Sequence, residues 1–382
     1  MMVEGVLLGA LALVAWLWLR PNRARVHPAL GAKTWDVVAD GLHNSNTDLI
    51  HYRGQLLLVH AASPYHMGTS DCRLVVRRSA DGRHWEKLAE LRMPGEDIRD
   101  PKFAVIAGKL FLYALPNRGF YALPYGTVYS TSDTGEQWTP FERVVLVGSE
   151  PEGWLFWRPK TRDDITWYVP AYWKHHGRSI LLHSTDGVRW NLVSEIWRGE
   201  GNDETDIEWL PDGRMLATAR LEVTPDRMLG NREASTLLAT AAPPYERWSY
   251  HKSRVTRLDG PALFAHDGRI YAVARYQAGT RGVLTRLGGT FSRKRTSLFL
   301  VEPERLVRLS DLPSAGDTSY AGVVLNDGAL FVSYYTSEIR RDYPWILGML
   351  LPTNIRMAEV PLDRLAQLAR EKAGLKEAAS PT

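Results

Sequence analysis

The chain has 382 residues, of which 45% are hydrophobic and 24% charged, and it carries a net charge of +4 at neutral pH. This composition is typical of a globular protein with a large core, and a mild charge without a long basic tract argues against nucleic acid as a partner. The single cysteine, Cys72, excludes an internal disulfide and a cysteine-based metal cluster. We expect neither a metal nor another cofactor.

Residues 1–20 predict a hydrophobic anchor or signal segment. The apolar run at 5–19 is followed by arginines at positions 20, 23 and 25, and it is short for a membrane-spanning helix, although the residues before it lengthen it. We expect a single N-terminal helix that anchors the protein to a membrane, and an uncleaved signal peptide is the alternative. The side of the membrane stays open, because the arginines favour a main body in the cytoplasm whereas the fold predicted below argues for the opposite side. Residues 21–33, with two prolines and a glycine, predict a linker.

From residue 34 onward the chain repeats one pattern, in which an apolar strand, a tight turn and a second apolar strand follow one another. The pattern is clearest at 201–220, where Pro211-Asp212-Gly213 supplies the turn. A hairpin brings its open ends together, so Glu204 and Arg220 are expected on one face of the fold. Similar hairpins occur at 48–60, 100–113, 158–172, 260–275 and 320–335. Six units spaced roughly 45–60 residues apart predict an all-β, six-bladed propeller.

A second turn motif recurs in the first three units, at 79–85, 131–138 and 184–190. In the copy at 184–190, Asp186 can cap backbone N–H groups, Gly187 tolerates a positive φ, and Trp190 buries a large apolar surface. The motif predicts structure rather than chemistry. We expect the propeller to span 34–365, with a strand at 34–40 closing the sixth blade. A C-terminal helix and tail follow at 366–382, and their leucine pattern begins near Pro361.

Blade geometry predicts which polar residues share the top face of the propeller. In a four-stranded blade, the inner strand begins at this face and the second strand ends there. The residues expected there are Asp48, Arg99, Asp100, Arg158, Glu204 and Tyr320 at the starts of inner strands, and Arg220, Arg275 and Tyr335 at the ends of second strands. Buried charged groups are unfavourable unless they are paired or used. A self-satisfied polar network along the channel is the alternative to a functional site.

The sequence resembles the Asp-box (BNR) propellers of the sialidase superfamily. Glu204, the turn at 210–214 and Arg220 match the family's spacing of a carboxylate, a Leu-Pro-Asp-Gly-Arg turn and a substrate arginine, and Tyr320 in 317–324 resembles its nucleophile. Further motifs at 46–50, 99–102, 244–248, 312–320 and 332–337 resemble uncharacterised bacterial exo-sialidase-like glycosyl hydrolases. The resemblance implies a sialidase-like six-bladed β-propeller, here preceded by the N-terminal hydrophobic helix.

The resemblance also implies a glycoside hydrolase that acts on a terminal sugar of a carbohydrate or glycoconjugate, with an anionic sugar as one candidate. Tyr320 would be the nucleophile and Glu204 would take its proton. The acid would be Asp48, Asp100 or Asp71, with His66 as a further candidate on the same top loop of blade one as Asp71. The substrate-binding residues would be Arg220, Arg275, Arg99, Arg158 and Tyr335.

The segment at 46–50 departs from the family, because it lacks the first arginine of the family's carboxylate-binding triad. A catalytically inactive propeller that binds a glycan or a partner at the membrane is therefore the alternative. Two long loops, at 278–295 and 339–353, should stand side by side on the pocket rim. The first is basic and the second apolar, so they either contact an anionic lipid surface or form a lid over the pocket.

Overall fold

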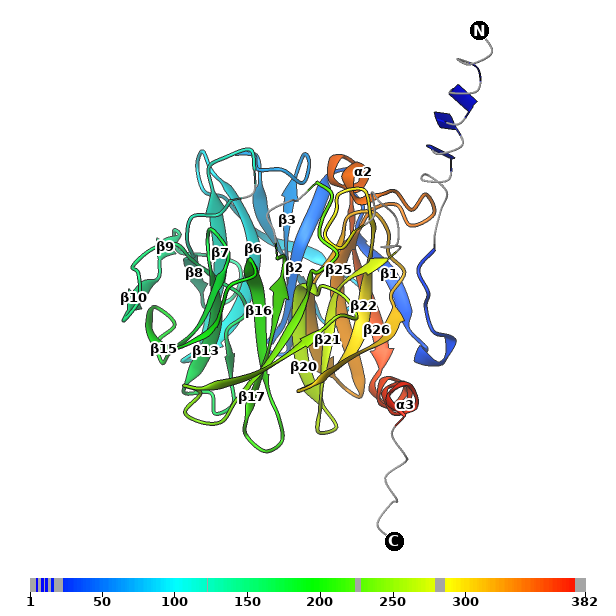
Figure 1. Ribbon diagram of the computed structural model, residues 1–382. Helices are drawn as coiled ribbons and strands as arrows, with labels where there is room; N and C mark the ends of the chain where they lie inside the picture. The colour runs from blue at the N-terminus through cyan, green and yellow to red at the C-terminus, as the bar shows by residue number, and fades with distance from the viewer. Residues whose placement is uncertain are drawn as a thin grey trace.

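In a computed structural model, residues 23–121, 123–223, 228–278 and 286–374 are described, together with seven isolated positions between Gly5 and Trp16. Six sheets, built mainly from antiparallel strands, form a ring, which confirms the predicted all-β six-bladed propeller (Figure 1). The predicted anchor helix at 1–20 lies largely outside the described residues. Among the helices that are described, none is long and apolar enough to cross a lipid bilayer.

The first two blades are regular four-stranded sheets. Blade one consists of β2 (His43–Tyr52), β3 (Gln55–Ser63), β4 (Arg73–Ser79) and β5 (Glu86–Leu91), and blade two of β6 (Asp97–Ile106), β7 (Lys109–Asn117), β8 (Val128–Ser132) and β9 (Glu142–Arg143). Their apolar faces meet in one cluster, in which Leu74 and Val76 of blade one pack with Phe103 and Leu112 of blade two. The core therefore lies in layers between neighbouring blades.

Blade three departs from this plan, because its inner strand is broken into β11 (Trp154–Phe156) and β12 (Lys160–Thr161). Both segments pair with β13 (Trp167–Trp173), which is followed by β14 (Arg178–Ser184) and β15 (Arg189–Arg198). A short strand, β10 (Val145–Val147), adds to β15 in parallel. Arg158 falls in the break, so its position was not determined by strand periodicity.

The last three blades return to four strands. Blade four consists of β16 (Asn202–Trp209), β17 (Met215–Leu221), β18 (Ser235–Ala241) and β19 (Trp248–Ser253), and blade five of β20 (Asp259–His266), β21 (Arg269–Ala278), β22 (Arg293–Glu302) and β23 (Arg305–Asp311). Blade six consists of β24 (Thr318–Asn326), β25 (Ala329–Thr336), β26 (Asn354–Pro361) and β1 (Lys33–Val38). Pairing of β1 with β26 closes the ring as predicted, because it joins both ends of the propeller in one sheet.

The recurring turn motifs have the predicted structural role. Asp186 Oδ1 accepts hydrogen bonds from the backbone N–H groups of Val188 and Arg189, both at 2.8 Å. Gly187 has a φ of 77°, and the indole N–H of Trp190 donates to its carbonyl at 3.0 Å. Trp190 itself is fully buried. The turn thus fixes a large apolar side chain against the neighbouring blade.

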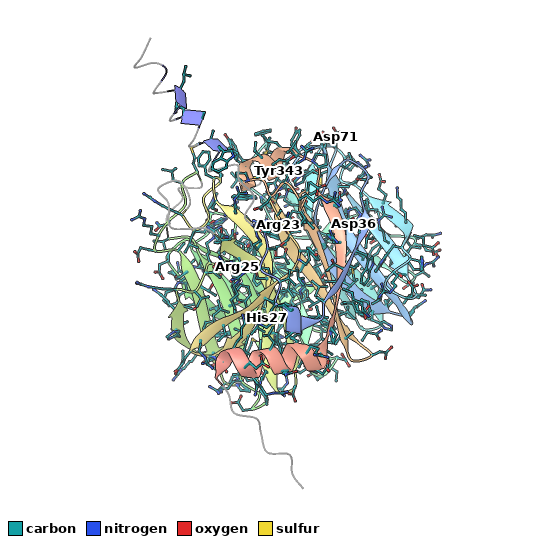
Figure 2. The ribbon with its side chains drawn as sticks, turned by 90° about the vertical axis from the view of Figure 1, so that its right-hand side faces the viewer. Arg23, Arg25, His27, Asp36, Asp71 and Tyr343 are labelled. Carbon is teal, nitrogen blue, oxygen red and sulfur yellow. The ribbon has the colours of Figure 1, made fainter. Side chains whose placement is uncertain are left out.

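Three short helical segments lie outside the sheets of the ring (Figure 1). A 3-10 turn, η1 (Pro28–Leu30), packs against α3 (Leu362–Ala373), which begins within the range predicted for the propeller. The helix α2 (Trp345–Leu350) lies at the opposite end of the ring from α3. The predicted linker follows the side of blade five, where the Arg25 N–H donates to Asp311 Oδ2 at 2.6 Å (Figure 2).

The inner strands carry irregularities near their starts. Pairing with the second strand shifts register between Ser45 and Asp48 in blade one and at the equivalent places in blades two, four, five and six. Asn46, Asp100 and Tyr320 take left-handed φ values of 48°, 52° and 46° at these bulges. A bulge re-aims side chains that regular alternation would send elsewhere, and all three of these residues line the central pocket.

Candidate functional site

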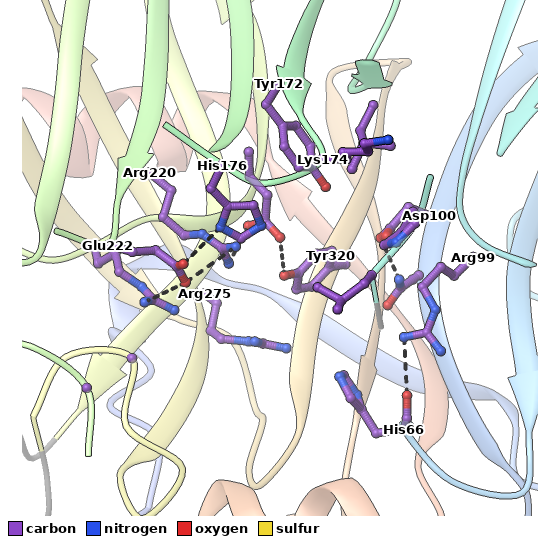
Figure 3. Close-up of a pocket in the computed structure, with 18 of the residues that line it drawn as sticks. His66, Arg99, Asp100, Tyr172, Lys174, His176, Arg220, Glu222, Arg275 and Tyr320 are labelled. Carbon is purple, nitrogen blue, oxygen red and sulfur yellow. Dashed lines mark hydrogen bonds and ion pairs between the residues drawn. The ribbon is translucent and has the colours of Figure 1, made fainter. Parts of the chain in front are cut away.

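A polar pocket opens where the inner strands begin, and all six blades contribute to its wall (Figure 3). Six of the ten predicted site residues line it: Arg99, Asp100, Glu204, Arg220, Arg275 and Tyr320. The other polar or aromatic lining residues include His66, Tyr172, Lys174, His176, Glu222, Arg257 and Trp345. The predicted ring of charged and tyrosyl residues is therefore present in large part.

Tyr320 and Glu204 form the centre of the pocket. The Tyr320 hydroxyl donates a short hydrogen bond to Glu204 Oε1, although the two residues are 116 positions apart (Figure 3). Glu204 Oε2 accepts from the Gly260 N–H at 2.7 Å and lies 2.9 Å from Arg220 Nη1. Burial raises the pKa of Glu204 to about 7, although Arg220 opposes this shift. Glu204 is therefore a stronger base than an ordinary carboxylate.

Trp157 and Arg275 both contact the Tyr320 ring. Trp157 meets it edge-on at 6.1 Å between ring centroids, and the Arg275 guanidinium carbon lies 4.9 Å from the ring centroid. Burial, and then the negative charge of Glu204, hold the pKa of Tyr320 well above its usual value. The phenol is therefore protonated at rest, and its hydrogen points at the Glu204 carboxylate.

Arg220 and Arg257 of the pocket are each paired with a carboxylate of the protein. Arg220 Nε donates to Asp203 at 2.6 Å, and its Nη2 reaches the other oxygen of Asp203 at 2.5 Å. Arg257 forms the same kind of fork with Asp259, at 2.6 and 3.1 Å, and its Nη1 donates to Glu222 at 3.2 Å. Since Arg220 Nη1 also contacts Glu204, all three nitrogens of Arg220 face carboxylates. Bidentate pairing of this kind fixes each guanidinium plane.

Asp317 is the hub of a second network beside the pocket. Its Oδ1 accepts from Arg275 Nη2 at 3.0 Å, from the Tyr335 hydroxyl at 3.0 Å and from the Trp345 indole at 2.8 Å. Its Oδ2 lies 2.7 Å from His66 Nδ1 and 3.2 Å from His43 Nε2. Tyr335 is fully buried in this network and does not line the pocket, so its predicted contact with substrate is indirect.

Arg99 and Asp100 stand on the blade-two side of the pocket. Arg99 Nε donates to Asp97 at 2.6 Å, and its Nη1 donates to the His66 carbonyl at 3.2 Å (Figure 3). The Asp100 carboxylate accepts from the Asn46 side chain at 2.5 Å. Both predicted residues therefore border the space that a ligand would fill.

Asp48 and Arg158 lie elsewhere, paired with each other inside the ring. Arg158 Nη1 contacts Asp48 Oδ1, while Asp48 Oδ2 accepts from the Phe103 N–H at 2.7 Å. Arg158 also donates to the Ala321 carbonyl at 3.0 Å. These contacts join four blades, and neither residue lines the pocket. The pair has the geometry of a structural cross-link.

Asp71 is exposed on the β3–β4 loop and lies outside the pocket lining (Figure 2). Its backbone N–H donates to the Thr69 hydroxyl at 3.2 Å, which is an ordinary turn contact. His66, from the same loop, reaches the pocket instead. Of the three aspartates predicted as the acid, only Asp100 borders the ligand space.

The apolar loop of blade six contacts the pocket through the short helix α2. Trp345 of α2 lines the pocket, and its backbone N–H donates to the Ser292 carbonyl at 3.0 Å. Ile346 N–H donates to the Thr290 carbonyl at 2.8 Å. The described part of the first loop, 286–295, therefore lies beside α2 as predicted, and Trp345 faces the pocket network.

Three residues of the pocket, Arg257, His176 and Glu222, were not predicted, nor was Asp317 of the network beside it. Glu222 was detectable, because it follows Arg220 by two positions at the end of the same strand and so points the same way. Two clusters, His43–His66–Asp317 and His176–Asp203–Glu222, hold ligand-type atoms within 4.8 Å of one another. In each cluster the carboxylates already accept bonds from arginines, so we assign both clusters to the hydrogen-bond network.

No protein-family model and no curated protein matches the sequence. The fold does match solved structures. A protein of unknown function from Dyadobacter fermentans aligns with a TM-score of 0.62 and 14% identity, over 86% of this chain and 99% of that one. Trypanosoma rangeli sialidase in complex with sialic acid aligns with a TM-score of 0.63 and 13% identity, over 91% of this chain and 61% of that one.

A mutant of NanB sialidase from Streptococcus pneumoniae aligns with a TM-score of 0.59 and 11% identity, over 90% of this chain and 71% of that one. At such identities the likeness concerns the fold alone. The chain has a sialidase-like propeller fold, which confirms the predicted resemblance at that level.

Proposed function

We propose that this sialidase-like propeller is a glycoside hydrolase that releases a terminal sugar. One observation carries the proposal: the buried Tyr320 hydroxyl donates to the Glu204 carboxylate inside the polar pocket. A tyrosine is a weak nucleophile at its ordinary pKa near 10 and needs an adjacent base. Burial raises the pKa of Glu204 to about 7, which makes it that base.

The reaction has two steps. The Tyr320 oxygen bonds to the anomeric carbon as its proton passes to Glu204, and the glycosidic C–O bond breaks while an acid protonates the leaving oxygen. In the second step water attacks the anomeric carbon and gives a proton to the conjugate base of that acid. The Tyr320 oxygen leaves and recovers its proton from Glu204.

Arg220 and Arg275 support this chemistry from their observed positions. Arg220 contacts Glu204 at 2.9 Å and holds its carboxylate in line with Tyr320. The Arg275 cation lies 4.9 Å from the centroid of the Tyr320 ring, where it stabilises negative charge that develops on the phenol oxygen. Arg99 and Asp100 border the ligand space and are proposed to hydrogen-bond sugar hydroxyls.

The pairing of the pocket arginines with carboxylates bears on whether the sugar is neutral or anionic. Arg220 and Arg257 direct all their nitrogens at protein carboxylates, and Arg275 is paired with Asp317. An anionic sugar would have to displace one of these partners, whereas sugar hydroxyls can donate to the carboxylates and accept from the cations. We therefore expect neutral terminal sugars to be better substrates than sialic or uronic acids.

A panel of aryl glycosides of neutral sugars, uronic acids and sialic acids tests the proposal. Turnover by the full chain should fall by at least about 100-fold in Glu204→Gln and Tyr320→Phe, with Asp71→Asn as an exposed control outside the pocket. Glycan binding without turnover would overturn the hydrolase proposal in favour of a glycan-binding propeller. Preference for an anionic sugar would refute only the charge argument.

A further inference from the structure

The proposed reaction needs an acid on the side of the sugar opposite Tyr320, and the predicted aspartates supply it poorly. Asp48 is bound inside the ring, Asp71 is exposed outside the pocket, and Asp100 already accepts a hydrogen bond from Asn46. Resting on the proposed function, we infer that His66 is the catalytic acid and base and that Asp317 positions it. His66 would protonate the leaving oxygen and later take a proton from the attacking water.

The backbone of His66 is held from two sides. Its N–H donates to the Met349 carbonyl of α2 at 2.9 Å, and its carbonyl accepts from Arg99 Nη1 at 3.2 Å. The imidazole meets the Trp345 ring nearly at a right angle, with 6.2 Å between centroids. Two separate elements, α2 and β6, therefore fix where the ring stands in the pocket wall.

Asp317 determines which nitrogen of His66 is available. Burial would raise the pKa of Asp317, but His66, His43 and Arg275 hold it well below its usual range, so the carboxylate is ionised. An ionised carboxylate only accepts, so His66 Nδ1, at 2.7 Å, must be the donor. The proton that can be exchanged is therefore the one at Nε2, and Asp317 stabilises the imidazolium when Nε2 is protonated.

His66 is the accessible member of the network. Its side chain keeps 22% of its surface exposed and lines the pocket, whereas His43 and Asp317 are completely buried. His43 lies against the same oxygen of Asp317 at 3.2 Å, and its Nδ1 is bonded to the Leu351 carbonyl at 2.9 Å. His43 therefore holds the carboxylate in place and cannot reach a substrate.

The surroundings of His66 make its imidazolium a stronger acid than a free imidazolium. Burial lowers the pKa of its imidazole, although Asp317 opposes the shift, and His43 and Arg99 add to the lowering. A protonated His66 therefore gives up its proton readily once the leaving oxygen begins to take charge. Arg275, Tyr335 and Trp345 hydrogen-bond to Asp317 Oδ1, so Asp317 Oδ2 stays directed at His66.

The decisive variant is His66→Asn, because its amide N–H can replace Nδ1 as the donor to Asp317 but provides no acid. With an alkyl or sugar leaving group, which needs protonation, the rate should fall about 100- to 10,000-fold. With a dinitrophenyl leaving group, which departs without a proton, formation of the glycosyl–enzyme should stay within about threefold of wild type. Azide should then accelerate turnover and yield a glycosyl azide, because azide attacks the anomeric carbon without a base.

Two comparisons keep the outcomes separate. Asp317→Asn should also slow substrates with a poor leaving group more than those with a dinitrophenyl group, but by less than His66→Asn does. Asp100→Asn, which alters a proposed sugar contact, should slow both substrate types by a similar factor. Equal losses on both leaving groups in His66→Asn, at an unchanged melting temperature and without azide rescue, would overturn the role of His66. Absence of turnover in the wild type on every aryl glycoside would instead refute the proposed function.

Discussion

Gly260 contacts both members of the proposed catalytic pair, so replacing it with alanine is a sensitive test of their geometry. Its N–H donates to Glu204 Oε2 at 2.7 Å, and a Cβ at this position would lie 2.8 Å from Tyr320 Cγ and 2.9 and 3.1 Å from two further ring atoms. Carbon atoms in contact normally stand about 3.5–4.0 Å apart. The Tyr320 ring must therefore retreat by roughly 0.7–1 Å in Gly260→Ala.

A displacement of about 1 Å in a reacting group can slow a reaction about 100-fold. The substitution also has a backbone cost, because Gly260 has a φ of 60°, and a non-glycine residue loses about 1–2 kcal/mol in that region. Gly328 provides the matched control. It has a φ of 76° in the β24–β25 turn, and a Cβ there would meet nothing within 4 Å.

We expect Gly260→Ala to lose about 100-fold in kcat/KM, while Gly328→Ala keeps wild-type activity. Chemical denaturation should give at least the backbone loss of about 1–2 kcal/mol in both variants. The assay is steady-state hydrolysis of the best aryl glycoside found in the substrate panel. If Gly260→Ala kept activity within about threefold of wild type, the contact between Tyr320 and Glu204 would not be required, and the reasoning would fail.

Two further predictions concern protonation and stability. With an activated aryl glycoside, kcat/KM should rise with pH through about 7, because Glu204 takes the Tyr320 proton only when ionised and burial raises its pKa to about 7; a rate that stays level between about pH 6 and 8 would contradict this. Asp48→Ala should lower the free energy of unfolding by about 3–5 kcal/mol, because Arg158 is left buried without its carboxylate. Urea titration measures the loss, and a stable variant with impaired kcat would instead favour a catalytic Asp48.

Features that depend on neighbouring residues could be predicted. The turn at 184–190 needs only Asp186, Gly187 and Trp190, since the carboxylate caps N–H groups two and three positions ahead. The closing strand was predicted at 34–40 and is found at Lys33–Val38, because the sixth blade otherwise lacked a fourth strand. The positions of Glu204, Tyr320 and Arg220 in one pocket followed from the same strand count.

Features that depend on small backbone shifts could not be predicted. Asp48 and Asp100 look equivalent at the starts of inner strands, yet Asp100 lies at the bulge and lines the pocket whereas Asp48 follows the bulge and points at Arg158. Relative to the bulge, Asp48 corresponds to Lys102 and Asp100 to Asn46, so the two aspartates are not equivalent. Arg158 itself falls where the inner strand of blade three breaks, which no periodicity indicates.

The repeat, the turns, the closure of the ring and the set of polar residues that begin its inner strands could be inferred from the chain alone, because they follow from chemistry within a few positions of one another. Which of those residues meet depends on the folded ring. The Tyr320–Glu204 bond spans 116 positions and the His66–Asp317 bond 251, so both exist only because a closed ring brings distant blades to one axis. Closure of the ring also buries these residues. Burial raises the pKa of Glu204, and the buried arginines Arg220, Arg257 and Arg275 are each paired with a carboxylate.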